Sequence, residues 1–388
     1  MAELLNRLRF LWAVLTKGWR LGWDFLEMTN RRFCNSPNKI IGWSRGYPSY
    51  YLLSPPALSK PAMNSLTTRI MSLYQWRKLP DVVTIAVTDA CNYKCEHCSA
   101  TSMREPDGSL LSTSEWKGVL RQTQELGVAS IVFVGGEPLM RDDLCELVES
   151  VDRDLSQVVV FTNGCALAEK AQELRRAGVT SVIVSIDSPE AQEHDRRKGV
   201  SDAFARAVVG IKAARKQKLL TGISAVVRPE DLTNGTLVRL FDLGRELRVN
   251  QILLFDAVAT GNFSERKDLQ WQASELDTII ELSASYQRKR GYPGIHCYTY
   301  TKSHRGIGCA GGVSYFHIAP HGEVCPCDFN PDSVGNVRDA PLHVLWDRFA
   351  RQGYDCSSLD GCRRQKAKIQ VIGLDTASLE VPGRRQIQ

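Results

Sequence analysis

The sequence predicts an α/β fold built on a parallel sheet. From residue 81 onward, apolar and β-branched runs alternate with helical patterns. Strands that alternate with helices of this length indicate βαβ units, whose parallel sheet is buried on both faces. Six such units can be counted, short of the eight that close a full barrel. The predicted strands are 82–88, 130–134, 158–161, 181–186, 222–227 and 251–255, and helical patterns cover 114–125, 144–152, 169–177 and 204–216.

Three cysteines follow the first predicted strand with the spacing CxxxCxxC: Cys91, Cys95 and Cys98. Three thiolates on one tight loop can ligate three irons of a [4Fe–4S] cube and leave the fourth iron open. An open metal position lets a cluster bind and activate a small molecule as well as pass electrons. The alternative is a zinc knuckle, which requires four ligands, commonly in CxxC pairs. The spacing therefore favours an iron–sulfur cluster.

The stretch CNYKCEHC resembles the signature of the radical S-adenosylmethionine (SAM) superfamily. The resemblance implies a partial (β/α)6, TIM-like barrel that covers about residues 81–290. It also implies that the open iron chelates SAM and that the reduced cluster cleaves it to a 5′-deoxyadenosyl radical, which abstracts hydrogen from a substrate carbon. Such an enzyme needs a reductant such as flavodoxin or ferredoxin.

Further motifs follow the predicted strands, at the edge where parallel α/β proteins place their chemistry. Residues 135–138 resemble the GGEP element of the family, residues 162–164 its TNG element and residues 185–187 its S-x-D element. The resemblance implies that the GGEP backbone contacts the SAM amino group and that the S-x-D side chains face the cofactor pocket. The predicted SAM contacts in these motifs are Gly135, Gly136, Glu137, Thr162, Asn163, Ser185 and Asp187.

Residues 194–199 resemble the family element HDxxRG with one departure. Lys198 stands where arginine is usual, and Arg197 lies one place earlier. The two cations differ in reach and in hydrogen-bond geometry. Arg197 and Lys198 are therefore both candidates for contact with the SAM carboxylate or ribose.

A second group of cysteines lies near the C-terminus, and the segment 308–329 within it predicts a β-hairpin with a Pro-His-Gly turn. The pattern resembles the auxiliary-cluster domains called twitch and SPASM. A structural zinc site is the alternative, since four thiolates suit zinc equally well. Cys325, in the same segment, is not one of the four predicted ligands and would be a pocket thiol or an alternative ligand. The resemblance implies one auxiliary [4Fe–4S] cluster held by Cys309, Cys327, Cys356 and Cys362.

Composition is that of an ordinary globular chain, with 43% hydrophobic and 24% charged residues. Twelve cysteines gathered near SAM-like motifs indicate metal in a reducing compartment rather than disulfides. We therefore expect a cytoplasmic protein. Near the auxiliary cysteines, Asp328, His304 and His317 can be considered as a catalytic base, but surface or core roles are favoured for each.

Residues 1–80 are basic and rich in tryptophan, with twelve Lys or Arg against three Asp or Glu. No uncharged run reaches the roughly 20 residues of a spanning helix. An amphipathic helix in residues 1–30, lying on the inner face of a membrane, is one interpretation. A helix that docks on the barrel or forms a dimer seam is the other. Nucleic acid is not expected as a partner, because no basic stripe continues into the catalytic body. The apolar stripe is Leu5, Leu8, Trp12, Leu15, Trp19, Trp23 and Leu26.

These observations divide the chain into four parts. They are a helix and Pro-rich connector, the barrel, a cluster-binding hairpin and loop domain, and a tail. A short helix over 63–76 leads into the barrel. The predicted boundaries are 1–80, 81–292, 293–364 and 365–388.

The main functional hypothesis is a radical SAM enzyme that catalyses an oxidation or a bond formation. Its substrate would be a hydrophobic small molecule, such as a lipid, isoprenoid or tetrapyrrole. The alternative is a maturase of a ribosomally made peptide, because many relatives with auxiliary clusters modify peptides. A non-catalytic or electron-transfer iron–sulfur protein is a third possibility, which the SAM-pocket motifs disfavour.

Overall fold

The computed structural model describes residues 39–75, 78–104, 108–266, 269, 271–299 and 310–352. Its centre is a nine-stranded sheet in the order β11-β10-β3-β4-β5-β6-β7-β8-β9. All neighbours pair in parallel except β10 and β11, which form an antiparallel hairpin. The strands are β3 Val82–Ala86, β4 Ser130–Val134, β5 Gln157–Thr162, β6 Ser181–Ser185, β7 Leu220–Val227, β8 Gln251–Asp256, β9 Gly294–Cys297, β10 Tyr315–Ile318 and β11 Val324–Cys325.

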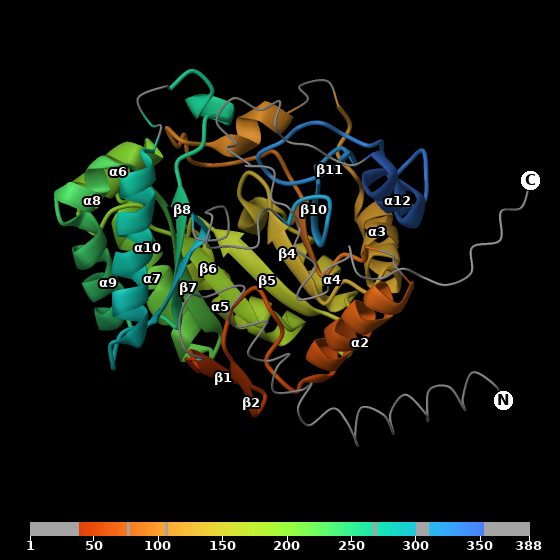
Figure 1. Ribbon diagram of the computed structural model, residues 1–388, viewed down its shortest axis with the longest axis horizontal. Coiled ribbons are helices and arrows are strands. Elements are labelled where there is room, and N and C mark those ends of the chain that lie inside the picture. The colour runs from red at the N-terminus through yellow and green to blue at the C-terminus, as the bar shows by residue number, and fades with distance from the viewer. Residues whose placement is uncertain are drawn as a thin grey trace, which may run out of the picture.

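Helices cover the outer face of this curved sheet (Figure 1). Their buried side chains recur at helical spacing, as in α5, where Leu167, Ala171 and Leu174 enter the core. A capping box between Ser112 and Glu115 begins α3. The helices are α2 Lys60–Gln75, α3 Thr113–Glu125, α4 Leu144–Glu149, α5 Leu167–Ala177, α6 Ala191–Lys198, α7 Ala203–Lys216, α8 Glu230–Thr233, α9 Thr236–Glu246, α10 Ala273–Arg288 and α12 Leu342–Gln352.

The predicted parallel α/β fold and partial TIM-like barrel are confirmed, but the sheet is larger than the six predicted strands. The strand β9 and the β10–β11 hairpin add to its two edges. β9 has only four residues, too few for a clear alternation of apolar and polar positions. Because these strands continue the barrel sheet, the division at residue 293 stays a prediction.

The connector before the barrel closes the end at which the strands begin. Its short hairpin, β1 Gly42–Ser44 and β2 Tyr47–Ser49, lies at the bottom of Figure 1. Beyond it, the buried Leu52 packs inside the barrel against a cluster of residues from five strands. The Leu52 N–H donates to Gln251 Oε1 (2.9 Å), and its carbonyl accepts from Gln157 Nε2 (3.1 Å). The opposite end of the barrel is therefore left for chemistry.

The predicted N-terminal helix of residues 1–30 and the predicted tail of residues 365–388 lie outside the described residues. Among the residues that are described, no helix is both long enough and apolar enough to cross a bilayer.

Candidate active site

Side chains that point into the barrel form two layers, because alternate residues of a strand face the same side. The lower layer packs on the connector and contains Val159 of β5 and Leu253 of β8. The upper layer, two residues further along each strand, includes the partly exposed Phe161 and Phe255. Phe255 stacks on Tyr298 with a centroid distance of 4.3 Å. Phe161, Phe255 and Tyr298 therefore form an apolar wall along part of the lumen, beside polar inward-facing residues such as Ser185 and Thr84.

The loop of residues 91–98 leaves β3 at this upper end and is held first by the GGEP turn. The Gly136 N–H donates to the Thr88 carbonyl (2.7 Å), and the Glu137 N–H donates to the Ala90 carbonyl (2.8 Å). A Cβ atom on Gly136 would lie 2.2 Å from the Ala90 oxygen, so only glycine allows this approach. The turn thereby fixes the point where the loop begins.

Two further elements hold the loop. At the C-terminal end of α6, the Lys198 carbonyl accepts from Lys94 N–H (3.1 Å) and the Arg197 carbonyl from Glu96 N–H (3.0 Å). In the short 3-10 helix η3 (Gly261–Phe263), Asn262 donates its N–H to the Cys98 carbonyl (3.1 Å) and its side-chain Nδ2 to the Cys95 carbonyl (2.9 Å). No sequence signal singles out Asn262, because its role depends on the fold bringing the segment after β8 against the loop after β3.

The thiols of Cys91, Cys95 and Cys98 are partly buried and close enough to influence one another electrostatically. Burial raises the pKa of Cys95 to about 11, against the opposing charge of Lys198. Burial also raises the pKa of Cys91. Within the described residues, no three His, Cys, Asp or Glu side chains are gathered tightly enough to hold a single metal ion.

Three soft sulfur donors on a loop whose Cys95 and Cys98 carbonyls already accept hydrogen bonds fit a thiolate-ligated cube. Such a cube is larger than one ion, so it does not require the tight gathering that a single ion needs.

Lys198 joins the S-x-D motif to the cysteine loop. Its Nζ lies 2.6 Å from Asp187 Oδ2 and donates to Ser185 Oγ at 2.6 Å. Burial alone would raise the pKa of Asp187, but the positive charge of Lys198 lowers it well below its usual range. The pKa of Lys198 is raised despite burial, because of Asp187 and the Cys95 thiol. Ser185, Asp187 and Lys198 thus form one charged group beside the thiols.

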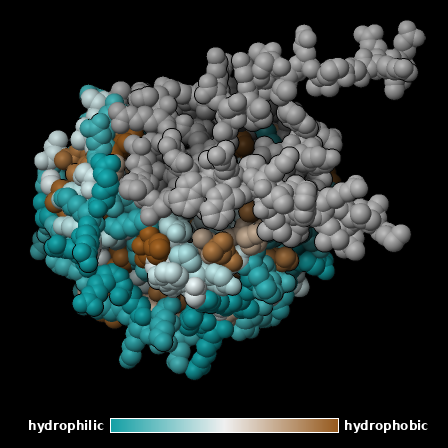
Figure 2. Space-filling model, turned by 60° about the horizontal axis from the view of Figure 1, so that its bottom comes forward, coloured by the Kyte–Doolittle hydropathy of each residue, from teal (hydrophilic) through white to brown (hydrophobic). Residues whose placement is uncertain are grey.

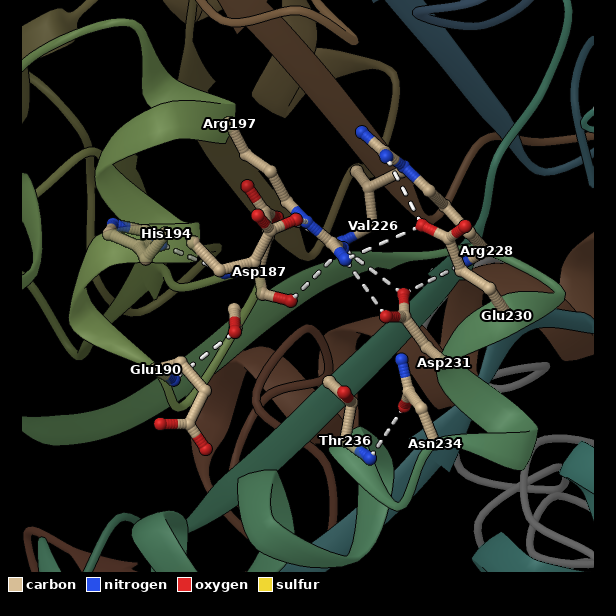
Figure 3. Close-up of polar contacts among 12 residues, drawn as sticks. Asp187, Glu190, His194, Arg197, Val226, Arg228, Glu230, Asp231, Asn234 and Thr236 are labelled. Carbon is tan, nitrogen blue, oxygen red and sulfur yellow. Dashed lines mark hydrogen bonds and ion pairs between the residues drawn. The ribbon is translucent and has the colours of Figure 1, made fainter.

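The Arg197 guanidinium reaches across to α8 (Figure 3), and its Nη1 also donates to the Asp187 backbone carbonyl at 3.5 Å. The guanidinium donates to both carboxylate oxygens of Asp231, at 3.1 and 2.9 Å, and to Glu193 at 2.7 Å. The side chains of Arg197 and Asp231 are only 3% and 1% exposed. Of the two candidate cations, Lys198 contacts the Asp187 and Ser185 side chains, whereas Arg197 ties α6 to α8 and touches only the main chain of Asp187.

Glu137 links the GGEP turn to the TNG motif. Its buried carboxylate accepts from Thr162 Oγ1 and from the Asn163 N–H, both at 2.7 Å. Burial is the main cause of the raised pKa of Glu137. Asn163 Nδ2 in turn donates to Asn92 Oδ1 in the cysteine loop (2.7 Å). The motif residues that follow β4 and β5 are therefore joined to each other and to the loop.

Comparison with known proteins identifies the family. Residues 85–241 match the sequence profile of the Radical SAM superfamily. The chain belongs to this superfamily. As a radical SAM enzyme it uses a [4Fe–4S] cluster and SAM, as the cysteine spacing and the strand-end motifs predict.

Two kinds of relative illustrate what this radical SAM enzyme is similar to. An AdoMet-dependent heme synthase of Methanosarcina barkeri is 29% identical over 290 residues, which are 69% of this chain and 82% of the relative. A PqqA peptide cyclase of Gluconobacter oxydans is 28% identical over 269 residues, 67% of this chain and 75% of the relative. The solved structure of Streptococcus suis SuiB bound to S-adenosylmethionine has a TM-score of 0.60 at 17% identity and covers 74% of this chain and 70% of SuiB. That likeness shows the shared fold.

The predicted auxiliary site is described only in part. The hairpin of β10 and β11 forms as expected around the turn at residues 320–322. Cys327 is buried, and Cys325 is buried with its pKa raised to about 12 by burial. Cys309, Cys356 and Cys362 lie outside the described residues. The auxiliary cluster of this radical SAM enzyme therefore stays a prediction.

A polar group on the hairpin faces the lumen. Asp328 accepts from Thr84 Oγ1 and Tyr315 Oη, and His317 Nδ1 lies 2.8 Å from its Oδ1. Burial would raise the pKa of Asp328, but the contacts with His317 and Thr84 keep it lowered. Its side chain retains 30% exposure. The sequence favoured a surface or core role for Asp328. The structure places Asp328, which follows β11, against Thr84 on the inward face of β3, where the parallel pairing of β10 with β3 brings it.

Proposed function

We propose that this radical SAM enzyme carries out an oxidation or bond formation on a hydrophobic small molecule of the tetrapyrrole class. The observation that carries the proposal is the apolar wall that Phe161, Phe255 and Tyr298 form inside the barrel, one layer above the residues that pack on the connector. Flat aromatic side chains favour a flat ring system through stacking and burial of apolar surface. The likeness to an AdoMet-dependent heme synthase supports the same class.

Each motif has a proposed share in this function. Cys91, Cys95 and Cys98 hold the cluster, which together with SAM supplies a radical that abstracts hydrogen from an unactivated carbon. Lys198 and Ser185 orient SAM through its carboxylate or ribose, a role that Arg197 is poorly placed to share. The remaining motif residues complete the SAM pocket or hold the cysteine loop in place; they are Gly135, Gly136, Glu137, Thr162, Asn163 and Asp187.

Asp328 is the proposed polar contact for the substrate. It is a partly exposed carboxylate held by three hydrogen-bonding side chains on the inward side of β3. A carboxylate fixed in this way can orient a substrate donor or accept a proton after hydrogen abstraction. The apolar wall would then bind the ring system while Asp328 selects its orientation.

An auxiliary [4Fe–4S] cluster is proposed on Cys309, Cys327, Cys356 and Cys362, in a domain of residues 293–364. The hairpin that carries Cys327 supports this assignment. A cluster with four protein ligands would accept the electron that an oxidation releases. Flavodoxin or ferredoxin would supply electrons to the first cluster. Residues 1–30 would attach the cytoplasmic enzyme to the inner face of a membrane, with residues 31–80 as the connector and 365–388 as the tail.

The second candidate is a peptide maturase, favoured by the likeness to a PqqA peptide cyclase. A peptide substrate would need backbone contacts along a strand or groove. The two candidates differ in what should stimulate the release of 5′-deoxyadenosine from SAM.

The test uses the anaerobically prepared enzyme with SAM, a chemical reductant and a panel of porphyrins and iron porphyrins. We expect a tetrapyrrole to bind, with quenching of protein fluorescence, and to stimulate 5′-deoxyadenosine release. Phe161→Ala and Phe255→Ala should each weaken binding about tenfold, whereas Val209→Ala, on the exposed face of α7, should not. Absence of tetrapyrrole binding would overturn the proposal. Stimulation by a peptide instead would establish the second candidate.

A further inference from the structure

A hollow of about 290 Å³ lies at the end of the barrel opposite the cysteine loop. Four cations line it: Lys39, Arg215 in the last turn of α7, Arg245 in the last turn of α9, and Arg248 in the loop before β8. No Asp or Glu belongs to the lining that the described residues form. The hollow is therefore strongly basic.

Two of these cations, Arg215 and Arg248, have neither an ion pair nor a side-chain hydrogen bond among the described residues. Lys39 Nζ donates to three backbone carbonyls, and Arg245 lies 3.5 Å from Asp242. By contrast, no ion pair joins Arg215 or Arg248 to an acidic side chain within the described part of the chain. Burial and the charge of Arg248 both lower the pKa of Arg215. Two like charges thus face one hollow without an internal counter-charge.

Helix dipoles favour the cations at this end but do not balance their charge. A cation near the C-terminal end of a helix offsets its partial negative charge, which applies to Arg215 on α7 and to Arg245 and Arg248 at the end of α9. Each helix end is equivalent to only about half a negative charge. The three arginines therefore leave the hollow with an excess of positive charge.

Exposed apolar side chains lie beside the hollow. On and next to the β1–β2 hairpin, Trp43 is 61% exposed, Ile40 45% and Tyr47 39%. Asn250 Nδ2 fixes the hairpin to the same end of the barrel through the Ile41 carbonyl (2.7 Å). Figure 2 brings this end forward and shows apolar spots among hydrophilic surface. Tryptophan and tyrosine beside cations are typical of side chains that lie at a membrane interface.

The described part of the chain begins at this same end. Lys39, the first described residue, is anchored by its three hydrogen bonds to carbonyls at residues 287–293. Residues 1–38 carry six Lys or Arg against three Asp or Glu, together with three tryptophans. A cationic segment does not complement a cationic hollow, but both complement an anionic surface.

We propose that this end of the barrel is a docking surface for a lipid bilayer with anionic headgroups. Arg215 and Arg248 contact lipid phosphates, and Trp43, Ile40 and Tyr47 enter the headgroup region. The upper lumen then opens away from the bilayer, so a hydrophobic substrate reaches it from the far side or from the bilayer edge.

The experiment is flotation of the full-length protein with vesicles of phosphatidylcholine alone or of a two-to-one mixture of phosphatidylcholine and phosphatidylglycerol. We expect binding to the anionic vesicles that weakens with salt. Arg215→Gln with Arg248→Gln should lower affinity about thirtyfold, at about fivefold per charge. Trp43→Ser should lower it several-fold. The controls are Arg121→Gln, an exposed cation on α3, and Val209→Ser, an exposed apolar residue on α7.

Thermal melting establishes that each variant is folded. Affinity unchanged in both the double arginine variant and Trp43→Ser would overturn the proposal, because binding would then reside in residues 1–38 alone. Equal loss in the control variants would overturn it as well. Vesicle binding is measured without substrate, so this test is independent of the proposed tetrapyrrole chemistry.

Discussion

His321 Nε2 lies 2.7 Å from Asp89 Oδ2. His321 is the centre of the turn between β10 and β11, and Asp89 stands two residues before Cys91. The contact therefore ties the C-terminal hairpin to the start of the cysteine loop. Together with the pairing of β10 on β3, it makes the geometry of the loop depend on a segment far along the chain, because His321 and Asp89 are 232 residues apart in sequence.

We expect His321→Ala to destabilise the protein by about 1–3 kcal/mol, because a buried polar contact is lost. Urea unfolding under anaerobic conditions measures this change. The same variant should retain less iron after dilution, since the loop loses one of its fixed points. His343→Ala, at an exposed position on α12, is the matched control. Full iron retention in His321→Ala would contradict a role for the hairpin in holding the loop.

Lys198→Met should weaken SAM binding about tenfold or more, because a hydrogen bond to a charged group contributes about 1.5–3 kcal/mol. It should also destabilise the fold, since Asp187 would be left buried without its main counter-charge. Equilibrium dialysis with SAM separates the two effects. Lys198→Arg should recover much of the binding, and an affinity equal to wild type in Lys198→Met would exclude this residue from the pocket.

Arg197→Met should differ from Lys198→Met, with a large effect on stability and a small effect on SAM binding. Breaking a buried ion pair costs about 3–5 kcal/mol, so the free energy of unfolding should fall sharply while the affinity for SAM changes little. Thermal unfolding and the same dialysis measurement test this expectation. A large loss of SAM affinity in a variant that is still folded would return Arg197 to the cofactor pocket.

Asn262→Ala should alter the environment of the cluster without removing a ligand. The change removes the side-chain bond to the Cys95 carbonyl, so the loop can shift relative to η3. We expect lower iron content and a changed electron paramagnetic resonance spectrum of the reduced protein. Asn64→Ala is the control, because the exposed Asn64 side chain also donates to one backbone carbonyl, that of Leu155 (3.3 Å), outside the cysteine loop. An unchanged spectrum would show that the Asn262 side chain does not help to hold the loop.

Stability should fall between pH 6.5 and 4 because of His194. Burial lowers its pKa to about 4 from 6.5, and its Nδ1 accepts the Asp187 N–H at 3.2 Å. The unfolded chain therefore binds a proton before the folded one does. Stability that is complete above pH 6.5 is lost as the pH falls, by about 1 kcal/mol at pH 5.5. His194→Asn keeps an acceptor oxygen but cannot titrate, so its unfolding free energy should change less between pH 8 and 5.5. Equal changes in both proteins would contradict this assignment.

Much of the barrel is predictable because its signals are local. Strands such as Ser130–Val134 and helices such as Thr113–Glu125 lie where apolar runs and helical periodicity indicate. The short strand β9 and the packing of Leu52 inside the barrel were not predicted, because four-residue strands and single buried leucines have no periodicity. Their placement depends on partners such as Gln251, far along the chain.

The sequence by itself determined the chemistry of this protein. Cysteine spacing and the order of motifs at strand ends are enough to specify a thiolate-bound cluster and a SAM pocket, because ligand type and spacing are local properties. Only the tertiary structure shows Lys198 against Asp187 and Arg197 against Asp231, and only it brings Asn262, His321 and Asp328 to the site. Those roles arise from parallel strand pairing and helix packing, which join residues that no pattern along the chain connects.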